Sequence, residues 1–193
     1  MEMTCEQARA LAKETLSDER FYHTECVAKA AAELARRYNF DVPTAERAAL
    51  LHDILKERDK EDLLQILKGS DIIDYVQIED CPALYHSYAG GVYVHDVLGL
   101  DMQTADAVRY HTAGRENMTL LDKIVFIADY ISEDRKFQGV DEVRKLAEHS
   151  LDEAVLTALR NGLIHLFKQY RYVNIESAKA YNFLLKHRSD QNG

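Results

Sequence analysis

The sequence predicts an all-α fold built from many short helices. Glycine occurs 8 times and proline twice in 193 residues, which is too few for the many tight turns of a β fold. Apolar residues instead recur at intervals of three and four along most of the chain, as in helices with one buried face. The chain is also long enough to bury a substantial core without disulfide or metal staples.

Helical patterns cover almost the whole chain, with no internal repeat and no change of composition that would mark a domain boundary. The first is rich in alanine, and in the second Val27, Ala31 and Leu34 share one helical face. The expected helices, in order, cover residues 5–16, 21–38, 41–55, 62–67, 82–97, 101–114, 120–131, 141–149, 150–170 and 174–186. We therefore expect a single domain over residues 1–193.

Two of these segments, 41–55 and 120–131, are apolar almost all round, so we expect both helices to be buried. Asp41 or Thr44 can cap the first of them, with Pro43 tolerated in its first turn. Caps and breakers also flank other segments, namely Gly69, Pro82, Gly99, Asp101, Gly114 and Asn174. Ser150 and Glu153 predict a capping box, in which each side chain caps the backbone of the other residue.

The net charge of the chain is −9, from 24 Lys and Arg against 33 Asp and Glu. Long nucleic acids and anionic membranes require a basic surface, so neither is an expected partner. A small anion is not excluded, because local charge governs its binding. The three cysteines show no disulfide or zinc-finger spacing, and no signal peptide or membrane span is recognisable. These features predict a soluble, cytoplasmic protein.

Eight histidines are the one unusual count, and their positions suggest a metal site. His52 and Asp53 lie in the apolar segment 41–55, where an ionisable pair is costly unless something neutralises it. Taken alone, this pair could equally be a satisfied hydrogen-bonded pair of the core. Other candidate ligands lie on separate helical segments, which makes the set His23, His52, Asp53, His86, His111 and Asp129. Imidazole and carboxylate ligands suit first-row transition metals, and six of them suit two cations that share a bridging carboxylate.

The order His, His-Asp, Asp resembles the HD-domain family of metal-dependent phosphohydrolases. Residues 20–24, 50–56, 110–115 and 127–131 are similar to the YqeK family within it, and the resemblance covers about residues 18–185. One departure follows Asp129, where the family usually has a Glu-Pro step and this chain has Ser132-Glu133-Asp134-Arg135. The resemblance implies a single HD-type helical bundle and an enzyme that cleaves diadenosine tetraphosphate symmetrically into two ADP.

The resemblance also implies how the ligands are shared. One metal would be held by His23, His52, Asp53 and Asp129, and the other by Asp53, His86 and His111, with Asp53 as the bridge. The cofactors would be two divalent or mixed-valence transition-metal ions, with iron as the first choice and manganese, cobalt, nickel and zinc as alternatives. A water activated by both metals would attack the tetraphosphate.

Several side chains beside these motifs are candidates for contact with substrate phosphates. Lys56 shares a helix face with Asp53, so both are assigned to catalysis, although Lys56 could also be an ordinary surface lysine. The expected substrate contacts are Arg20, His23, Lys56, His86, His111, Thr112, Arg115, Arg135 and Arg171. For the arginines a solvated or salt-bridged role is an equal alternative, and for Thr112 a local cap. The other four histidines lie outside these motifs.

Two other functions remain open from the sequence. The chain could be an HD-class phosphohydrolase that acts on nucleoside mono- or triphosphates, or a nucleotide-binding module without catalysis. In each case the expected partner is a small nucleotide, and the oligomeric state stays open, with a homodimer as one option.

Overall fold

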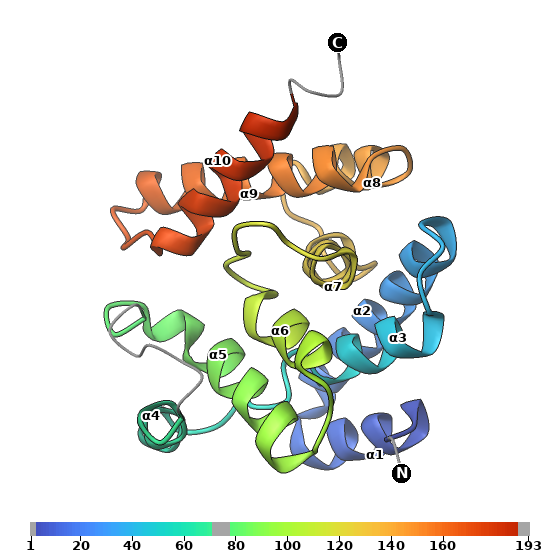
Figure 1. Ribbon diagram of the computed structural model, residues 1–193, viewed down its shortest axis with the longest axis vertical. Coiled ribbons are helices and arrows are strands. Elements are labelled where there is room, and N and C mark those ends of the chain that lie inside the picture. Colours follow the sequence, from blue (N-terminus) through green and yellow to red (C-terminus); the bar gives the residue numbers. More distant parts are fainter. Residues whose placement is uncertain (1–2, 71–77, 189–193) are drawn as a thin grey trace.

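A computed structural model describes residues 3–70 and 78–188 of the chain. All regular secondary structure in these residues is helical, which confirms the predicted all-α class (Figure 1). The helices are α1 (Cys5–Thr15), α2 (Asp18–Arg37), α3 (Val42–Leu51), α4 (Lys60–Lys68), η2 (Pro82–Leu84), α5 (Tyr85–Val92), η3 (Tyr93–Val97), α6 (Met102–Tyr110), α7 (Leu120–Ile131), α8 (Val140–Ala147), α9 (Leu151–Lys168) and α10 (Ile175–Arg188). None of the described helices is both long and apolar enough to cross a membrane.

Helix α7 lies at the centre of the molecule, in contact with α2, α3, α6 and α9 (Figure 1). It occupies the predicted range, and three of its apolar side chains, Leu121, Ile124 and Ile127, have no exposed surface. Burying each of these side chains stabilises the fold by about 1.5–3 kcal/mol. The prediction that this all-apolar helix is buried is therefore confirmed, and so is the same prediction for α3, where Leu50 and Leu51 are fully enclosed.

Side-chain caps begin several of the helices. Asp41, rather than Thr44, caps α3 by accepting the backbone N–H of Thr44 at 2.9 Å. Ser150 caps α9 through the backbone N–H of Glu153 at 3.3 Å, as predicted. The reciprocal half of this capping box is absent, because the Glu153 carboxylate pairs with the Arg188 guanidinium at 2.8 Å instead. The prediction of a complete box was therefore wrong.

Two helices, α3 and α6, end four residues earlier than the sequence predicts. Helix α3 ends at Leu51 rather than at residue 55, and turns follow over 52–57. The Ala49 carbonyl accepts both the backbone N–H of His52 at 3.3 Å and its ring Nδ1 at 2.7 Å, so the regular helical pattern is not continued. Helix α6 ends at Tyr110 rather than at Gly114. Both ends place a histidine at the last turn of a helix, where its ring can turn inward.

Helices α5 and α6 approach each other closely at Gly91. A Cβ atom at Gly91 would lie 2.7 Å from the Cβ of Arg109 and 2.9 Å from the carbonyl oxygen of Ala105, both closer than real contacts allow. Only glycine permits this separation of the two helices. The close approach brings His86 of α5 next to His111, whose ring centroid lies 5.4 Å away.

Candidate metal centre

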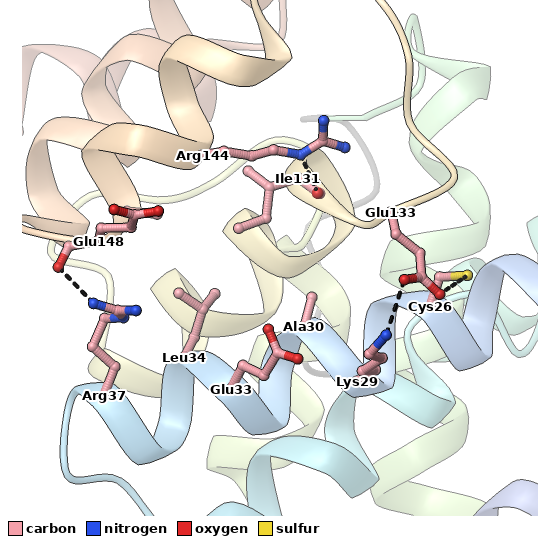
Figure 2. Close-up of a pocket in the computed structure, with 11 residues that line it drawn as sticks. Cys26, Lys29, Ala30, Glu33, Leu34, Arg37, Ile131, Glu133, Arg144 and Glu148 are labelled. Carbon is pink, nitrogen blue, oxygen red and sulfur yellow. Dashed lines mark hydrogen bonds and ion pairs between the residues drawn. The ribbon is translucent and has the colours of Figure 1, made fainter.

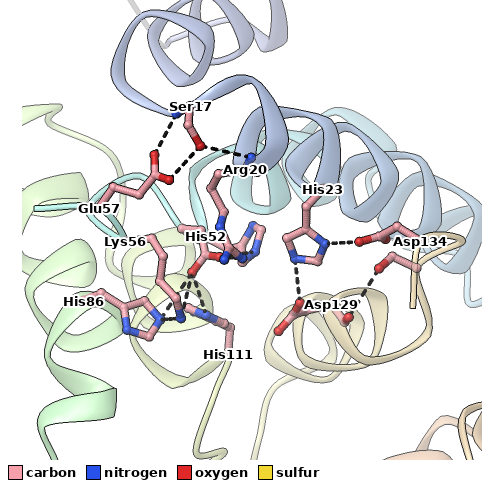
Figure 3. Close-up of polar contacts among 12 residues, drawn as sticks. Ser17, Arg20, His23, His52, Lys56, Glu57, His86, His111, Asp129 and Asp134 are labelled. Atoms are coloured by element: carbon pink, nitrogen blue, oxygen red, sulfur yellow. Dashed lines mark hydrogen bonds and ion pairs between the residues drawn. The ribbon is translucent and has the colours of Figure 1, made fainter. Parts of the chain in front are cut away.

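Side chains from five segments of the chain converge on one point inside the molecule (Figure 3). They are the six predicted ligands: His23 on α2, His52 and Asp53 just after α3, His86 on α5, His111 just after α6 and Asp129 on α7. Five of the six are buried, with at most 5% of their surface exposed, and Asp129 is half-buried. Residues up to 106 positions apart thus meet in one cluster.

One part of the cluster consists of His23, His52 and Asp129. One potential ligand atom from each of these residues lies within 4.8 Å of the others, a spacing that one metal ion can bridge. The His23 Nε2 atom lies 3.0 Å from Asp129 Oδ1, and the rings of His23 and His52 lie edge to face at 5.5 Å. These three residues belong to the predicted set for the first metal.

The other part surrounds Asp53. His52, Asp53 and His111 also offer ligand atoms within 4.8 Å of one another. Asp53 Oδ1 lies 3.3 Å from His86 Nε2 and 3.6 Å from His111 Nε2, while Oδ2 lies 3.4 Å from His52 Nε2. The two oxygens of Asp53 therefore face different histidines, which is the arrangement that a bridging carboxylate needs.

Two atoms of the cluster are buried polar groups without a hydrogen-bond partner among the described residues. They are His52 Nε2 and Asp53 Oδ1. Leaving such atoms unpaired costs about 1–3 kcal/mol each. The His52 and His111 rings each place Nδ1 at 2.7 Å from a backbone carbonyl, that of Ala49 and of Val108, which leaves Nε2 of both rings turned toward the cluster. Oriented imidazole nitrogens and an unpaired carboxylate oxygen fit a divalent metal ion.

The protonation states of both carboxylates and of His86 suit metal binding. Burial by itself would raise the pKa of Asp53, but the charge of His52 and the neighbouring rings of His111 and His86 hold it well below its usual range. The pKa of Asp129 is likewise lowered, because hydrogen bonding by His23 and the nearby charges of His52, Arg135 and His111 together outweigh the effect of burial. Burial lowers the pKa of His86 to about 4. At neutral pH both carboxylates are therefore ionised, and His86 is neutral with a lone pair to donate.

Three partly exposed basic side chains contact clustered residues, and two of them, Arg20 and Lys56, are drawn in Figure 3. The Arg20 guanidinium lies 3.1 Å from Asp53 Oδ2, and Lys56 Nζ lies 3.0 Å from His86 Nε2. Arg135 Nη2 lies 2.5 Å from Asp129 Oδ1. Their side chains are 31–34% exposed, against 3% for Asp53. All three were predicted as phosphate contacts, and all three line the solvent side of the cluster.

Three other predicted substrate contacts, Arg115, Thr112 and Arg171, have different surroundings. Arg115 forms ion pairs with Asp122 at 2.8 Å and with Asp106 at 3.0 Å, so its guanidinium has the salt-bridged role that the sequence left open. Thr112 is exposed in the turn after α6, and Arg171 is exposed after α9. Their contact with substrate stays a prediction.

Sequence reasoning assigned no role to Asp134 and did not consider Arg144. The Asp134 carboxylate lies 2.7 Å from Nδ1 of His23, on the side of the ring opposite Asp129 (Figure 3). Arg144 donates to three backbone carbonyls around the segment that carries Asp134. The only signal in the sequence was that residues 132–135 include consecutive acidic residues where the family usually has a Glu-Pro step. Sequence spacing alone could not predict that Asp134 contacts His23, a residue 111 positions away.

A model of the HD domain matches residues 20–134, which include all six clustered residues. The chain belongs to the HD-domain family. The YqeK resemblance is confirmed as well. An HD-domain relative from Bacillus subtilis, named a symmetrical bis(5'-nucleosyl)-tetraphosphatase, is 40% identical over 95% of this chain and 98% of its own. A relative from Halalkalibacterium halodurans with the same name is 36% identical over 93% of this chain and 96% of its own.

A solved HD-domain structure has the same fold. It comes from Clostridium acetobutylicum and is described as a predicted HD superfamily hydrolase involved in NAD metabolism. It superimposes with a TM-score of 0.89 at 31% identity and covers 97% of this chain and 100% of its own. The fold that the two proteins share therefore extends beyond residues 20–134, which the family model matches.

Proposed function

We propose that this HD-domain protein hydrolyses dinucleoside tetraphosphates symmetrically, so that diadenosine tetraphosphate gives two ADP. The observation that carries the reaction class is the buried cluster of four histidines and two carboxylates with three cations at its exposed side. The substrate rests on the names of the curated relatives, which match nearly the full length of the chain.

The cluster would hold two transition-metal ions. His23, His52, Asp53 and Asp129 are the proposed ligands of one ion, and Asp53, His86 and His111 of the other. The unpaired atoms His52 Nε2 and Asp53 Oδ1 support this assignment. Bound ions would supply Lewis acidity, which lowers the pKa of a water molecule and neutralises charge on phosphate oxygens. Iron remains our first choice of metal, with manganese, cobalt, nickel and zinc as alternatives.

The basic side chains of this protein would bind and orient the polyphosphate. Arg20, Lys56 and Arg135 are one-third exposed and adjoin the ligands, so a phosphate group that approaches from solvent meets them first. Their charges oppose the negative charge that builds on phosphate oxygens in the transition state. In the reaction, a water oxygen bonds to one of the two inner phosphorus atoms. The bond from that phosphorus to the central bridging oxygen breaks, and two ADP molecules leave.

The product pattern tests this function. Purified protein supplied with manganese or iron is incubated with diadenosine tetraphosphate, and the nucleotides are separated by chromatography. We expect ADP as the sole product. ATP with AMP, or no turnover, would contradict the proposal. Faster hydrolysis of nucleoside mono- or triphosphates in a competition assay would instead favour the broader phosphohydrolase function, and tight ADP binding without a product would favour a binding module.

The domain organisation, location and partners expected from the sequence are also part of the proposed function. The whole chain would act as one HD unit, in the cytoplasm, with a small nucleotide as its partner and with neither long nucleic acid nor membrane. The net charge of −9 supports the last point. Elemental analysis of protein purified without added metal tests the metal content, and we expect two transition-metal ions per chain. Light scattering tests whether the chain forms a homodimer.

A further inference from the structure

His23 is the one clustered histidine whose two ring nitrogens both face carboxylates. Nε2 lies 3.0 Å from Asp129 Oδ1, and Nδ1 lies 2.7 Å from Asp134 Oδ2. The His23 side chain is 6% exposed and that of Asp134 is 20% exposed. The Nδ1 contact is thus a short hydrogen bond, largely shielded from water, and the ring donates it to the carboxylate.

The position of His23 in its helix explains why this contact is needed. His52 and His111 follow the last turns of α3 and α6, where the carbonyl three residues earlier accepts the ring Nδ1–H. His23 lies inside α2, where the neighbouring carbonyls already accept helical N–H groups. Its ring therefore needs an acceptor from another part of the chain, and the Asp134 carboxylate is that acceptor.

Arg144 of α8 holds the segment that carries Asp134. Its guanidinium donates to the carbonyls of Ile131 at 2.9 Å, Ser132 at 2.8 Å and Arg135 at 2.8 Å, on both sides of Asp134. Figure 2 shows Arg144 above Ile131 at the wall of a cavity of about 400 Å³ on the outer side of this segment. Three hydrogen bonds from one planar group restrict the backbone of the segment, so the carboxylate is presented to His23 in one place.

The neighbouring Glu133 points away from the cluster. Its carboxylate pairs with Lys29 at 2.9 Å, and both side chains are more than half exposed (Figure 2). Two consecutive acidic residues thus have different surroundings, and Asp134 alone of the two contacts a candidate ligand. Glu133 is therefore a matched control, since it carries the same charge in the same segment.

We propose that Asp134 is a positioning residue that orients the His23 ring for metal binding, with Arg144 holding the segment in place. The inference deepens the proposed function and rests on it, because orientation of Nε2 matters only if His23 binds a metal. The carboxylate keeps the Nδ1–H bonded and orients Nε2 toward Asp129 and His52, so that its lone pair would be available to a metal. Outer carboxylates of this kind typically change metal affinity by about 10–100-fold.

Equilibrium dialysis against manganese measures the effect on metal binding. We compare the unaltered protein with Asp134→Ala, Asp134→Asn and Glu133→Ala. Asp134→Ala should weaken one of the two manganese sites by about 10–100-fold and leave the other unchanged. Asp134→Asn should recover most of the affinity, because its amide oxygen can still accept the Nδ1–H. Glu133→Ala should bind manganese as the unaltered protein does.

A measurement on metal-free protein separates this inference from the proposed function. In ¹⁵N-histidine-labelled protein, the hydrogen bond should protect the His23 Nδ1 proton from exchange and make it visible by NMR, with His23→Gln as the assignment control. Asp134→Ala should abolish this signal, and Glu133→Ala should keep it. A retained signal with unchanged manganese affinity in Asp134→Ala would overturn the inference. If the signal disappears as expected but the unaltered protein binds neither manganese nor iron, the contact is supported and the proposed function is refuted.

Discussion

Asp53 is the residue on which the cluster converges. Its carboxylate is 3% exposed, and its two oxygens face histidines from separate parts of the chain together with the Arg20 guanidinium. A buried carboxylate in this setting is stable only as an anion, because the surrounding positive and hydrogen-bonding groups lower its pKa. Its position between both groups of ligands makes it the proposed bridge.

Replacement of Asp53 by alanine should remove both metals and all hydrolysis. Both proposed metal sites share its carboxylate, and the variant leaves the neighbouring histidines without their counter-charge. Elemental analysis together with the product assay measures the two effects. Two cations still bound to Asp53→Ala would refute the bridging assignment.

Lys56→Ala is the matched control for that experiment. Lys56 touches the same carboxylate at 3.8 Å, but as a cation it is not a metal ligand. The variant should therefore keep both metals, while kcat falls by about 10²–10³-fold through loss of phosphate stabilisation. Loss of metal in this variant would show that Lys56 is structural.

The buried His86 should make the metal-free protein sensitive to acid. Burial lowers its pKa to about 4 from 6.5, so between these values the unfolded chain binds a proton that the folded chain does not. Stability is therefore lost as the pH falls from about 6.5 to about 4. Urea unfolding at pH 7 and pH 5 should show a loss for the unaltered protein about 2 kcal/mol larger than for His86→Gln. Equal losses would contradict the shift.

At the scale of elements, the ends and spacing of helices position the histidines. Helices α3 and α6 each stop at a residue before a histidine, whose ring then bonds a carbonyl of the last turn. Helix α5 instead depends on Gly91, which lets it lie close enough to α6 for His86 to meet His111. The helix ends are local features, whereas the α5–α6 separation is set by packing.

Gly91→Ala should destabilise the protein and disturb the cluster. The added methyl group would collide with the backbone oxygen of Ala105 and with Arg109, so α5 must move away from α6. A cost of about 1–3 kcal/mol is typical of such overpacking. Urea unfolding measures the stability, and manganese dialysis measures the site.

Gly162→Ala provides the contrasting control within α9. A Cβ atom there would meet nothing within 4 Å, and alanine is the better helix former. This variant should be about 0.5–1 kcal/mol more stable than the unaltered protein and should bind manganese equally well. If Gly91→Ala were also stabilising, the close approach would not be a constraint.

At the scale of the whole molecule, the fold gathers three basic side chains at one site of a negatively charged protein. The chain carries a net charge of −9, yet three basic side chains share the exposed side of the cluster. The ligands come from helices that all pack around α7 or adjoin those that do. Bound metal would therefore tie together segments that are distant in the sequence.

Metal removal should lower the stability of the entire fold. A ligand that binds only the folded chain stabilises it by about 2.7 kcal/mol at one hundred times its dissociation constant. Thermal unfolding of chelator-treated protein, with and without added manganese, should show a higher midpoint with manganese. Asp53→Ala should show no such response. A metal-independent midpoint for the unaltered protein would contradict binding at this site.

Much of the element pattern was predictable from local information. The range of α7 matches the prediction, because its apolar residues and the flanking polar residues mark both ends. The early ends of α3 and α6 were not predictable, since apolar periodicity continues past them. At each end, the ring Nδ1 of His52 or His111 bonds a backbone carbonyl of the last turn, and the sequence does not show this. The missing half of the Ser150 capping box was not predictable either, because Arg188 of another helix forms an ion pair with the Glu153 carboxylate.

By itself, the sequence determined the helical class, the buried character of α3 and α7 and the identity of six candidate ligands, because periodicity and costly buried ionisable groups are local signals. Only the tertiary structure decided which cations face the ligands and which do not. Arg135 forms an ion pair with Asp129, whereas Arg115 forms ion pairs with Asp122 and Asp106. The tertiary structure alone also brought Asp134 to His23. Such pairings depend on how distant helices pack, and helix packing cannot be deduced from the type and spacing of side chains in the sequence.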